Sequence, residues 1–212
     1  MARIVPTVLA SNPDEFKAMV ERAQSLSNRV HVDITDGDFT DGQTINLSQV
    51  YVKEGVSLDL HLMVVNIEDH LQTALSLKPR LIIIHAESKG DLPEVISEIK
   101  SMGVDAGVAI LPDTKVETAR ELIGTCDHVL IFTGKLGYNG GKFQEDQLSK
   151  VSEVRAINPY VEISVDGGVN IENAKQIKDA GIDILYAGGS IQKAENPNEA
   201  FDQLNNEIGG GK

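Results

Sequence analysis

The feature that most constrains the fold is a regular alternation of short apolar runs with amphipathic stretches along the whole chain. Eight runs rich in Val, Ile and Leu are candidate strands: ARIVPTVLA, RVHVDI, VSLDLHLMV, RLIIIHA, DAGVAIL, HVLIFT, VEISVDG and DILYAGG. Between most of them lie segments with helical period, which predict helices at residues 13–26, 67–77, 92–102, 170–180 and 196–207. An alternation of strands and helices indicates a parallel sheet.

Residues at the ends of these amphipathic stretches support their assignment as helices. Asn12 stands where an N-cap is needed, Pro13 occupies the first helical position, and Glu15 follows three residues after the cap. Gly103 and Gly181 directly follow two other stretches, as glycine does at the C-terminus of many helices. The predicted helix ends therefore agree with the apolar periodicity.

An open doubly wound sheet and a closed eight-stranded barrel both satisfy this alternation. Eight even units fill the 212 residues and leave no room for a second domain, which favours the closed barrel. We therefore predict an α/β protein of the (β/α)8 TIM-barrel class, with one domain over residues 1–208. The terminal residues 209–212, GGGK, are too rich in glycine to fold and are predicted to form a flexible tail.

Charge and composition exclude several classes of partner. A formal net charge of -13 repels nucleic acid and anionic membrane surfaces, so we expect neither as a partner. A small phosphorylated molecule stays compatible, because backbone N–H groups bind anions without lysine or arginine. The single Cys126 cannot form an intrachain disulfide, and no apolar run approaches the roughly 20 residues of a membrane helix, so a cytoplasmic protein is expected.

Four metal-ligating side chains stand at or near the ends of predicted strands. His31 and Asp33 lie two residues apart and so point to the same face of a strand, His61 lies in LDLHLMV, and Asp166 closes VEISVD. In a parallel barrel, the carboxyl ends of the strands meet at the functional face. Each residue alone has an ordinary explanation, a hydrogen-bonded core histidine or a turn-capping aspartate. Their joint occurrence predicts a site for one divalent ion, with Zn, Mn, Fe and Co all compatible.

The other histidines give weaker signals. His85 ends LIIIH on the same rim, where it could contact a substrate or only satisfy neighbouring backbone groups, and the sequence leaves both readings open. His70 falls inside a predicted helix and His128 begins a strand at the opposite end of the barrel. Neither is expected in the site.

Glycine-rich segments follow the last three predicted strands and form a second candidate feature. The residues concerned are Gly137, Tyr138, Asn139 and Gly140 after the sixth strand, Gly167 and Gly168 after the seventh, and Gly188 and Gly189 after the eighth. The loops after strands seven and eight are the usual phosphate-binding site of this fold. Ordinary tight turns are the alternative, but three such segments on one rim favour a phosphate site.

The motifs PTVLASN, HVDITDGDF, DLHLMV, IIIHAES, GVAILPDTKVE, LGYNGGKF and ISVDGGVN…AGGSI together resemble the ribulose-phosphate 3-epimerase family over nearly the whole chain. The resemblance implies a barrel of the ribulose-phosphate-binding type that interconverts D-ribulose 5-phosphate and D-xylulose 5-phosphate in the pentose phosphate pathway. It also implies a homodimer or larger homo-oligomer.

The resemblance also assigns roles to individual residues. His31, Asp33, His61 and Asp166 match the metal ligands, with Asp33 and Asp166 also acting as the acid and base of proton transfer at C3. The positions that match substrate contacts are Thr7, His61, Gly137, Tyr138, Asn139, Gly140, Asp166, Gly167, Gly168, Gly188 and Gly189.

The chain departs from the family pattern at four positions near the site. Thr35 and Phe132 replace methionines usual near the metal, Asn139 replaces a glycine and Gly189 replaces a serine. These changes keep other substrates open, such as allulose 6-phosphate or another ketose phosphate, and also a barrel that binds a sugar phosphate without catalysis. A related decarboxylase is disfavoured, because the run DITD at residues 33–36 contains no lysine.

Overall fold

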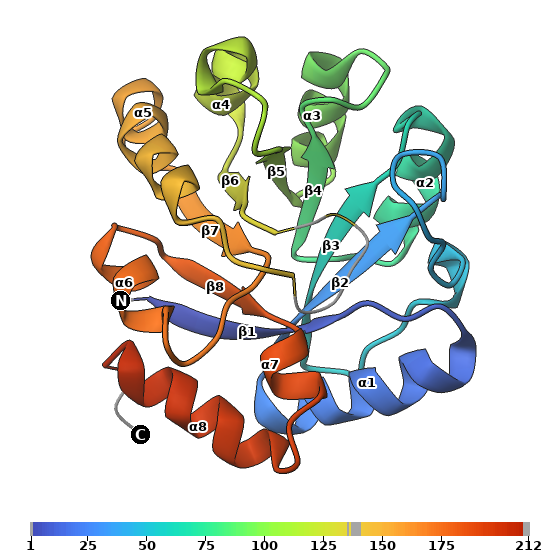
Figure 1. Ribbon diagram of the computed structural model, residues 1–212. Helices are drawn as coiled ribbons and strands as arrows, with labels where there is room; N and C mark the ends of the chain where they lie inside the picture. Colours follow the sequence, from blue (N-terminus) through green and yellow to red (C-terminus); the bar gives the residue numbers. More distant parts are fainter. Residues whose placement is uncertain (1, 135, 137–140, 210–212) are drawn as a thin grey trace.

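The computed structural model describes residues 2–134, 136 and 141–209. Its centre is a barrel of parallel strands that closes because β1 pairs with both β2 and β8 (Figure 1). The strands are β1 (Arg3–Val8), β2 (Arg29–Thr35), β3 (Ser57–Met63), β4 (Leu81–His85), β5 (Asp105–Ile110), β6 (His128–Phe132), β7 (Glu162–Asp166) and β8 (Ile184–Ala187). The predicted closed (β/α)8 barrel is confirmed, and the open sheet is excluded.

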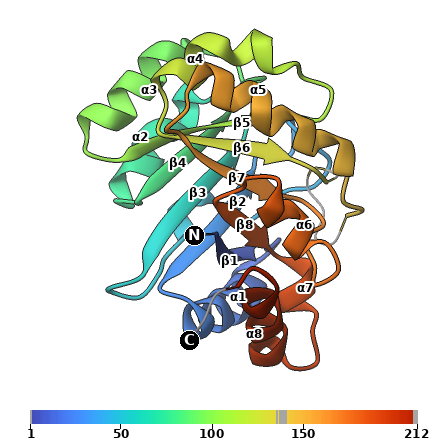
Figure 2. The same ribbon diagram turned by 90° about the vertical axis from the view of Figure 1, so that its left-hand side faces the viewer.

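Helices surround the barrel on its outside (Figures 1 and 2). They are α1 (Pro13–Leu26), α2 (Glu68–Ser76), α3 (Leu92–Ser101), α4 (Arg120–Thr125), α5 (Lys150–Ile157), α6 (Ala174–Asp179), α7 (Gly189–Gln192) and α8 (Pro197–Glu207), with 3-10 turns at Leu47–Gln49, Val116–Ala119 and Glu145–Ser149. Helix α1 begins as the sequence predicts, since the Asn12 side chain accepts a hydrogen bond from the Glu15 backbone N–H at 3.0 Å.

The hydrophobic core has two layers, which the alternation of side chains along each strand separates. Outward-facing residues such as Leu185 and Ala187 pack with the helices in the larger cluster. Inward-facing residues form the second cluster inside the barrel: Val5, Leu81, Ile83, Ala109, Leu130, Phe132, Ile184 and Tyr186. The layers are almost entirely aliphatic, as a chain with 4% aromatic residues requires. Packing on both faces explains why the strands read as continuous apolar runs.

An ionic network fills the N-terminal end of the barrel. Arg29 Nε donates to Asp59 Oδ2 at 2.6 Å, and Arg29 Nη2 reaches Glu162 Oε2 at 3.2 Å. His128 Nδ1 lies 3.0 Å from the same Glu162 oxygen, and the Tyr186 hydroxyl donates to Asp59 Oδ2 at 2.9 Å. His128 thus starts β6 at the end opposite the candidate site, as the sequence indicates.

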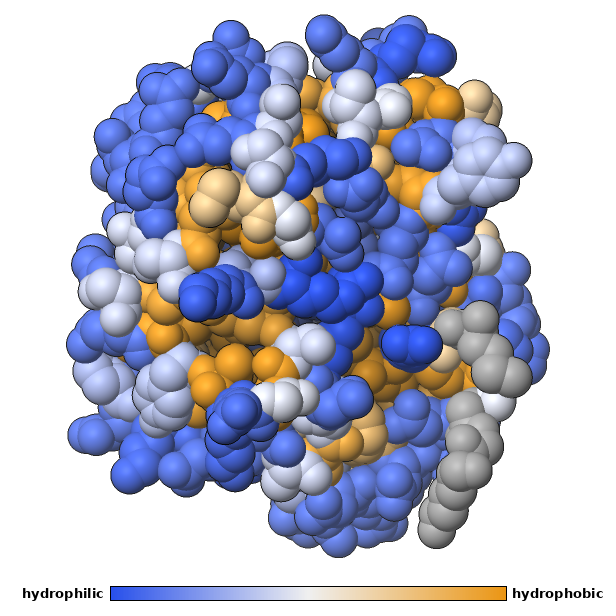
Figure 3. All heavy atoms as spheres, turned by 180° about the vertical axis from the view of Figure 1, so that it is seen from behind, coloured by the Kyte–Doolittle hydropathy of each residue, from blue (hydrophilic) through white to orange (hydrophobic). Residues whose placement is uncertain are grey.

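The outer surface is mainly hydrophilic. On the face shown in Figure 3, polar residues form the outermost parts and apolar residues lie mostly in recesses between them. Among the described residues, no helix is long and apolar enough to cross a membrane.

Candidate active site

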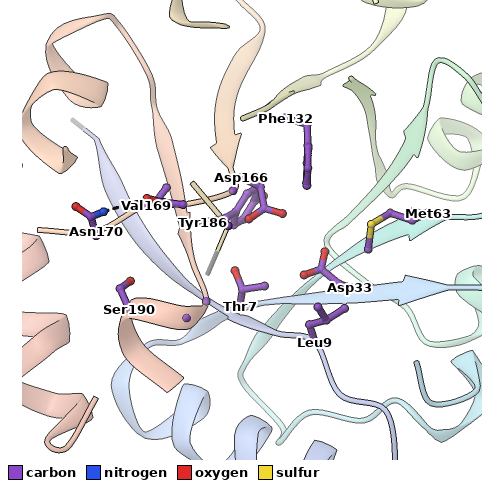
Figure 4. A pocket seen from close by; sticks show the side chains of 15 residues that line it. Thr7, Leu9, Asp33, Met63, Phe132, Asp166, Val169, Asn170, Tyr186 and Ser190 are labelled. Carbon is purple, nitrogen blue, oxygen red and sulfur yellow. Dashed lines mark hydrogen bonds between the residues drawn. The ribbon is translucent and has the colours of Figure 1, made fainter. Parts of the chain in front are cut away.

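A cavity of about 160 Å³ opens at the C-terminal ends of the strands. Its lining comprises Thr7, Leu9, Asp33, Met63, Phe132, Gly141, Asp166, Gly167, Gly168, Val169, Asn170, Tyr186, Gly188, Gly189 and Ser190. Asp33 from β2 and Asp166 from β7 point into it from different strands, and Thr7 of β1 lies below them in the view of Figure 4. The barrel thus brings the two carboxylates to one space although 133 positions separate them in the sequence.

The four predicted metal ligands form one buried cluster. His31 Nε2 lies 3.1 Å from Asp33 Oδ1, and His61 Nδ1 lies 2.8 Å from the same oxygen. One ligand atom from each of these residues and from Asp166 can be chosen so that all four lie within 4.8 Å of one another. Donors held by a single ion at about 2.0–2.2 Å lie roughly 3–4 Å apart, so this cluster is close to the spacing a metal requires.

Burial and charge give the two aspartates opposite acid strengths. Burial raises the pKa of the Asp33 carboxyl, but the neighbouring His31 and His61 outweigh it and hold that pKa well below its usual range. Asp166 is half-buried at the cavity wall; desolvation and the negative charge of Asp33 together raise the Asp166 pKa to about 7. Near neutral pH the pair therefore offers an ionised carboxylate beside a carboxyl that can carry a proton.

The two histidines of the cluster also differ. Burial lowers the pKa of His61 to about 4, with His85 and His31 adding to the effect and Asp33 opposing it. His61 is therefore neutral at pH 7, which is the form that binds a metal. Burial disfavours the charged form of His31 as well, but Asp33 outweighs it and raises the His31 pKa.

His85, whose role the sequence left open, lies behind His61 and does not line the cavity. Its Nε2 is 2.9 Å from His61 Nε2, and its Nδ1 is 3.2 Å from Glu87 Oε2. The His85 side chain is fully buried, so in this structure it contacts a metal-ligand candidate rather than the cavity.

The glycine pairs after β7 and β8 border the same cavity. Gly167 and Gly168 have positive φ angles of 110° and 77°, and a Cβ on Gly168 would lie 2.5 Å from the backbone N of Phe143. Only glycine fits such a close approach between loops. Gly188 and Gly189, which follow the neighbouring strand β8, line the same cavity next to Ser190. Of the predicted contacts, Gly137, Tyr138, Asn139 and Gly140 lie outside the described residues.

Tyr186 and Ser190 are among the lining residues that were not predicted from the sequence. The Tyr186 ring packs against His31 in a tilted arrangement, with ring centroids 3.8 Å apart, and could have been found as a polar aromatic residue at an inward-facing position of β8. Ser190 follows the second glycine pair, and its hydroxyl oxygen is buried with no hydrogen-bond partner among the described residues. The Thr7 hydroxyl oxygen is also buried without a hydrogen-bond partner among the described residues. Two hydroxyl groups beside the cavity can therefore form hydrogen bonds with a ligand.

Thr35 and Phe132, the two departures near the metal cluster, occupy different surroundings. The Thr35 hydroxyl accepts from Gly37 N at 3.3 Å and donates to Gly42 O at 3.4 Å, so it binds the loop after β2. Phe132 lies over the cavity, and its ring centroid is 6.4 Å from that of His61. Phe132 therefore gives the cavity an apolar wall.

Comparison with known proteins agrees with this geometry. The sequence profile described as the Ribulose-phosphate 3 epimerase family matches residues 3–192. The chain belongs to this family. A ribulose-phosphate 3-epimerase of Helicobacter pylori is 31% identical, with 96% of this chain and 97% of the relative covered. That of Schizosaccharomyces pombe is 29% identical, with 98% of this chain and 94% of the relative covered.

Solved structures of other enzymes share the fold. A 3-keto-L-gulonate-6-phosphate decarboxylase from Vibrio cholerae superposes with a TM-score of 0.77 at 13% identity, covering 98% of this chain and 97% of that one. A 3-hexulose-6-phosphate synthase from Salmonella typhimurium gives 0.73 at 12% identity, with 97% and 98% covered. At such low identity these likenesses show the barrel and nothing about the reaction.

Proposed function

We propose that this family member is an epimerase, an isomerase of carbohydrate metabolism that interconverts D-ribulose 5-phosphate and D-xylulose 5-phosphate at C3. The observation that carries the proposal is the pair Asp33 and Asp166, which point into one cavity from different strands with pKa values displaced in opposite directions. Inverting a carbon beside a carbonyl needs a base on one face and an acid on the other. Two carboxylates that face one cavity from different strands can supply both.

The proton transfers follow from the positions of these side chains. One carboxylate takes the C3 proton from one face, which leaves a planar enediolate, and the other carboxyl returns a proton to the opposite face. In the reverse direction the two groups exchange roles.

The residues present fit a divalent ion, and we propose that His31, Asp33, His61 and Asp166 hold it. Two imidazoles and two carboxylates suit Zn, Mn, Fe or Co. Such an ion supplies positive charge that stabilises a negative oxygen forming next to the reacting carbon. The phosphate is proposed to bind at Gly167, Gly168, Gly188 and Gly189, and the free hydroxyl groups of Ser190 and Thr7 are proposed to bind sugar or phosphate oxygens.

A coupled assay tests this proposal. Metal-loaded protein should convert ribulose 5-phosphate to xylulose 5-phosphate, and removal of the metal by a strong chelator should abolish the activity until the ion is restored. Side-by-side kinetics with allulose 6-phosphate should give the lower kcat/KM. A higher value for allulose 6-phosphate would reassign the substrate, and tight sugar-phosphate binding without turnover would contradict the epimerase proposal.

We further propose that the protein works in the cytoplasm as a homo-oligomer, with a sugar phosphate as its small-molecule partner and without nucleic acid or membrane. The rice relative is named a cytoplasmic isoform, whereas an Arabidopsis relative is named chloroplastic. Sedimentation of the purified protein measures the assembly state, and a purely monomeric species would contradict that part.

A further inference from the structure

A chain of side-chain contacts runs from the metal-ligand cluster away from the cavity. His61 Nε2 lies 2.9 Å from His85 Nε2, and His85 Nδ1 lies 3.2 Å from Glu87 Oε2. The other Glu87 oxygen accepts a hydrogen bond from the Leu111 backbone N–H at 3.1 Å. The ring planes are inclined by only 26°, but with the Nε2 atoms 2.9 Å apart and the centroids 4.9 Å apart the two imidazoles meet at their nitrogen edges. This arrangement determines which ring nitrogens of His61 and His85 carry a proton.

Two imidazole nitrogens 2.9 Å apart can share only one hydrogen, so one Nε2 donates and the other accepts. His61 Nδ1 faces Asp33 Oδ1 at 2.8 Å, whereas His61 Nε2 is turned to His85, so Nδ1 is the ring nitrogen that we assign to the ion. A ligating nitrogen carries no proton, so neutral His61 must carry its proton on Nε2. His85 Nε2 is then the acceptor, the proton of His85 lies on Nδ1, and the ionised Glu87 carboxylate accepts it.

We propose that His85 and Glu87 are positioning residues of the metal centre: they select the tautomer of His61 and hold its ring with Nδ1 toward the ion. The proposal rests on the metal centre of the proposed function. Metal-bound histidines commonly donate their second ring N–H to a carboxylate or carbonyl, and such partners raise the basicity of the ligand. Here the Glu87 carboxylate acts on His61 indirectly, through the imidazole of His85.

The surroundings of His85 prevent water from taking over this role. The His61 and His85 side chains are both fully buried, and the Phe39 ring covers His85 at a centroid distance of 4.7 Å. Asp36 holds Phe39 in place, because its Oδ1 accepts from the Phe39 N–H at 2.8 Å and its Oδ2 from the Val65 N–H at 2.7 Å. A lost partner of His61 is therefore not replaced by solvent.

The proposed role of His85 and Glu87 leads to a specific prediction for Glu87→Gln, which preserves the shape of the side chain and removes its charge. The amide oxygen of the new side chain is needed by the Leu111 N–H, so its NH2 group faces His85 Nδ1. His85 must then carry its proton on Nε2, directly opposite the Nε2–H of metal-bound His61. This conflict should weaken metal binding by about 10- to 100-fold, the usual effect of losing such a partner.

Zinc affinity of the full chain, measured by competition with a chromogenic chelator, tests the proposal independently of catalysis. Glu87→Gln and His85→Phe should each lose about 10- to 100-fold. His85→Gln places an amide oxygen where it can accept from His61 Nε2, so it should bind zinc more tightly than His85→Phe. Glu121→Gln on the exposed face of α4 is the matched control and should bind zinc as the parent does.

The tautomers give a second readout that a merely structural role would not move. In the zinc-loaded parent, nitrogen NMR of labelled histidine should show His85 protonated at Nδ1 and His61 at Nε2. A His85 protonated at Nε2, or Glu87→Gln with parental zinc affinity in folded protein, would overturn the proposal while leaving epimerisation untouched. If the unsubstituted protein binds zinc with these tautomers but does not epimerise the substrate, the proposed function is wrong, and the positioning role of His85 and Glu87 is supported. If the unsubstituted protein binds no divalent metal, both the positioning role of His85 and Glu87 and the proposed metal centre are wrong.

Discussion

Identical side chains acquire different chemistry at this site through their neighbours alone. Asp33 and Asp166 line the same cavity, but Asp33 contacts two imidazoles while Asp166 faces the charge of Asp33. The sequence could indicate both as site residues, because strand period and strand ends locate them. It could not indicate which one holds a proton, because that depends on distances between strands far apart in the chain.

Replacing Asp166 by asparagine preserves size and removes one proton-transfer group. Turnover should fall by at least about 100-fold in both directions, because each direction needs an acid and a base. The measurements are kcat in each direction, exchange of the C3 hydrogen with solvent deuterium, and metal content. Asp202→Asn, on the exposed face of α8, is the control and should keep parental activity. Parental turnover in metal-replete Asp166→Asn would remove Asp166 from the mechanism.

At the scale of elements, the sequence predicted strands and long helices well and the loops between them poorly. The stretches predicted at 13–26, 92–102 and 196–207 match α1, α3 and α8 within a residue at each end. The stretch predicted from residue 170 becomes helical only at Ala174, because the side chains of Asn170 and Asn173 bond the Gly168 carbonyl and the local backbone instead. Such bonds depend on tertiary loop geometry, and apolar periodicity does not report them.

The loop after β7 should be intolerant of even one methyl group. In Gly168→Ala the new Cβ would lie 2.6 Å from Gly141 O in a backbone with φ of 77°. We expect at least about 1 kcal/mol lower free energy of unfolding from the left-handed conformation alone, and a raised KM because the cavity wall moves.

Gly124→Ala provides the control, because nothing lies within 4 Å of its added Cβ and it lies inside α4. It should leave KM unchanged and stabilise the protein by about 0.5–1 kcal/mol. Urea unfolding and steady-state kinetics measure both variants. Equal stability and equal KM in the two variants would show that the loop is not as closely packed as the structure indicates.

For the whole molecule, the ionic network at the N-terminal end of the barrel should set its tolerance of acid. Burial raises the pKa of Glu162, but His128 and Arg29 outweigh it and lower that pKa from 4.5 to about 2. A carboxyl whose pKa is lower in the folded state stabilises the protein above its unfolded pKa. This contribution is fully present above about pH 4.5 and is lost as the pH falls toward 2.

Glu162→Gln should therefore lower the free energy of unfolding at pH 7 and make that free energy depend less on pH in the acid range. The lowered Glu162 pKa corresponds to roughly 3 kcal/mol as an upper bound, and solvent screening of this partly exposed carboxylate makes its contribution smaller. Urea unfolding at pH 7 and at pH 3 should show the parent losing more free energy than the variant over this interval. Glu121→Gln should follow the parent, and an acid dependence in Glu162→Gln as steep as the parent's would rule out this role for Glu162.

Tyr186 links the two ends of the barrel, since its ring packs against His31 while its hydroxyl donates a hydrogen bond to Asp59. In TIM barrels the C-terminal ends of the strands carry the catalytic residues, whereas the N-terminal end serves stability. Here a substitution at Asp59 would free the hydroxyl that anchors the ring beneath a ligand of the metal centre. Libraries that aim to improve heat resistance should therefore vary Asp59 and Tyr186 together and be screened for activity in the same round.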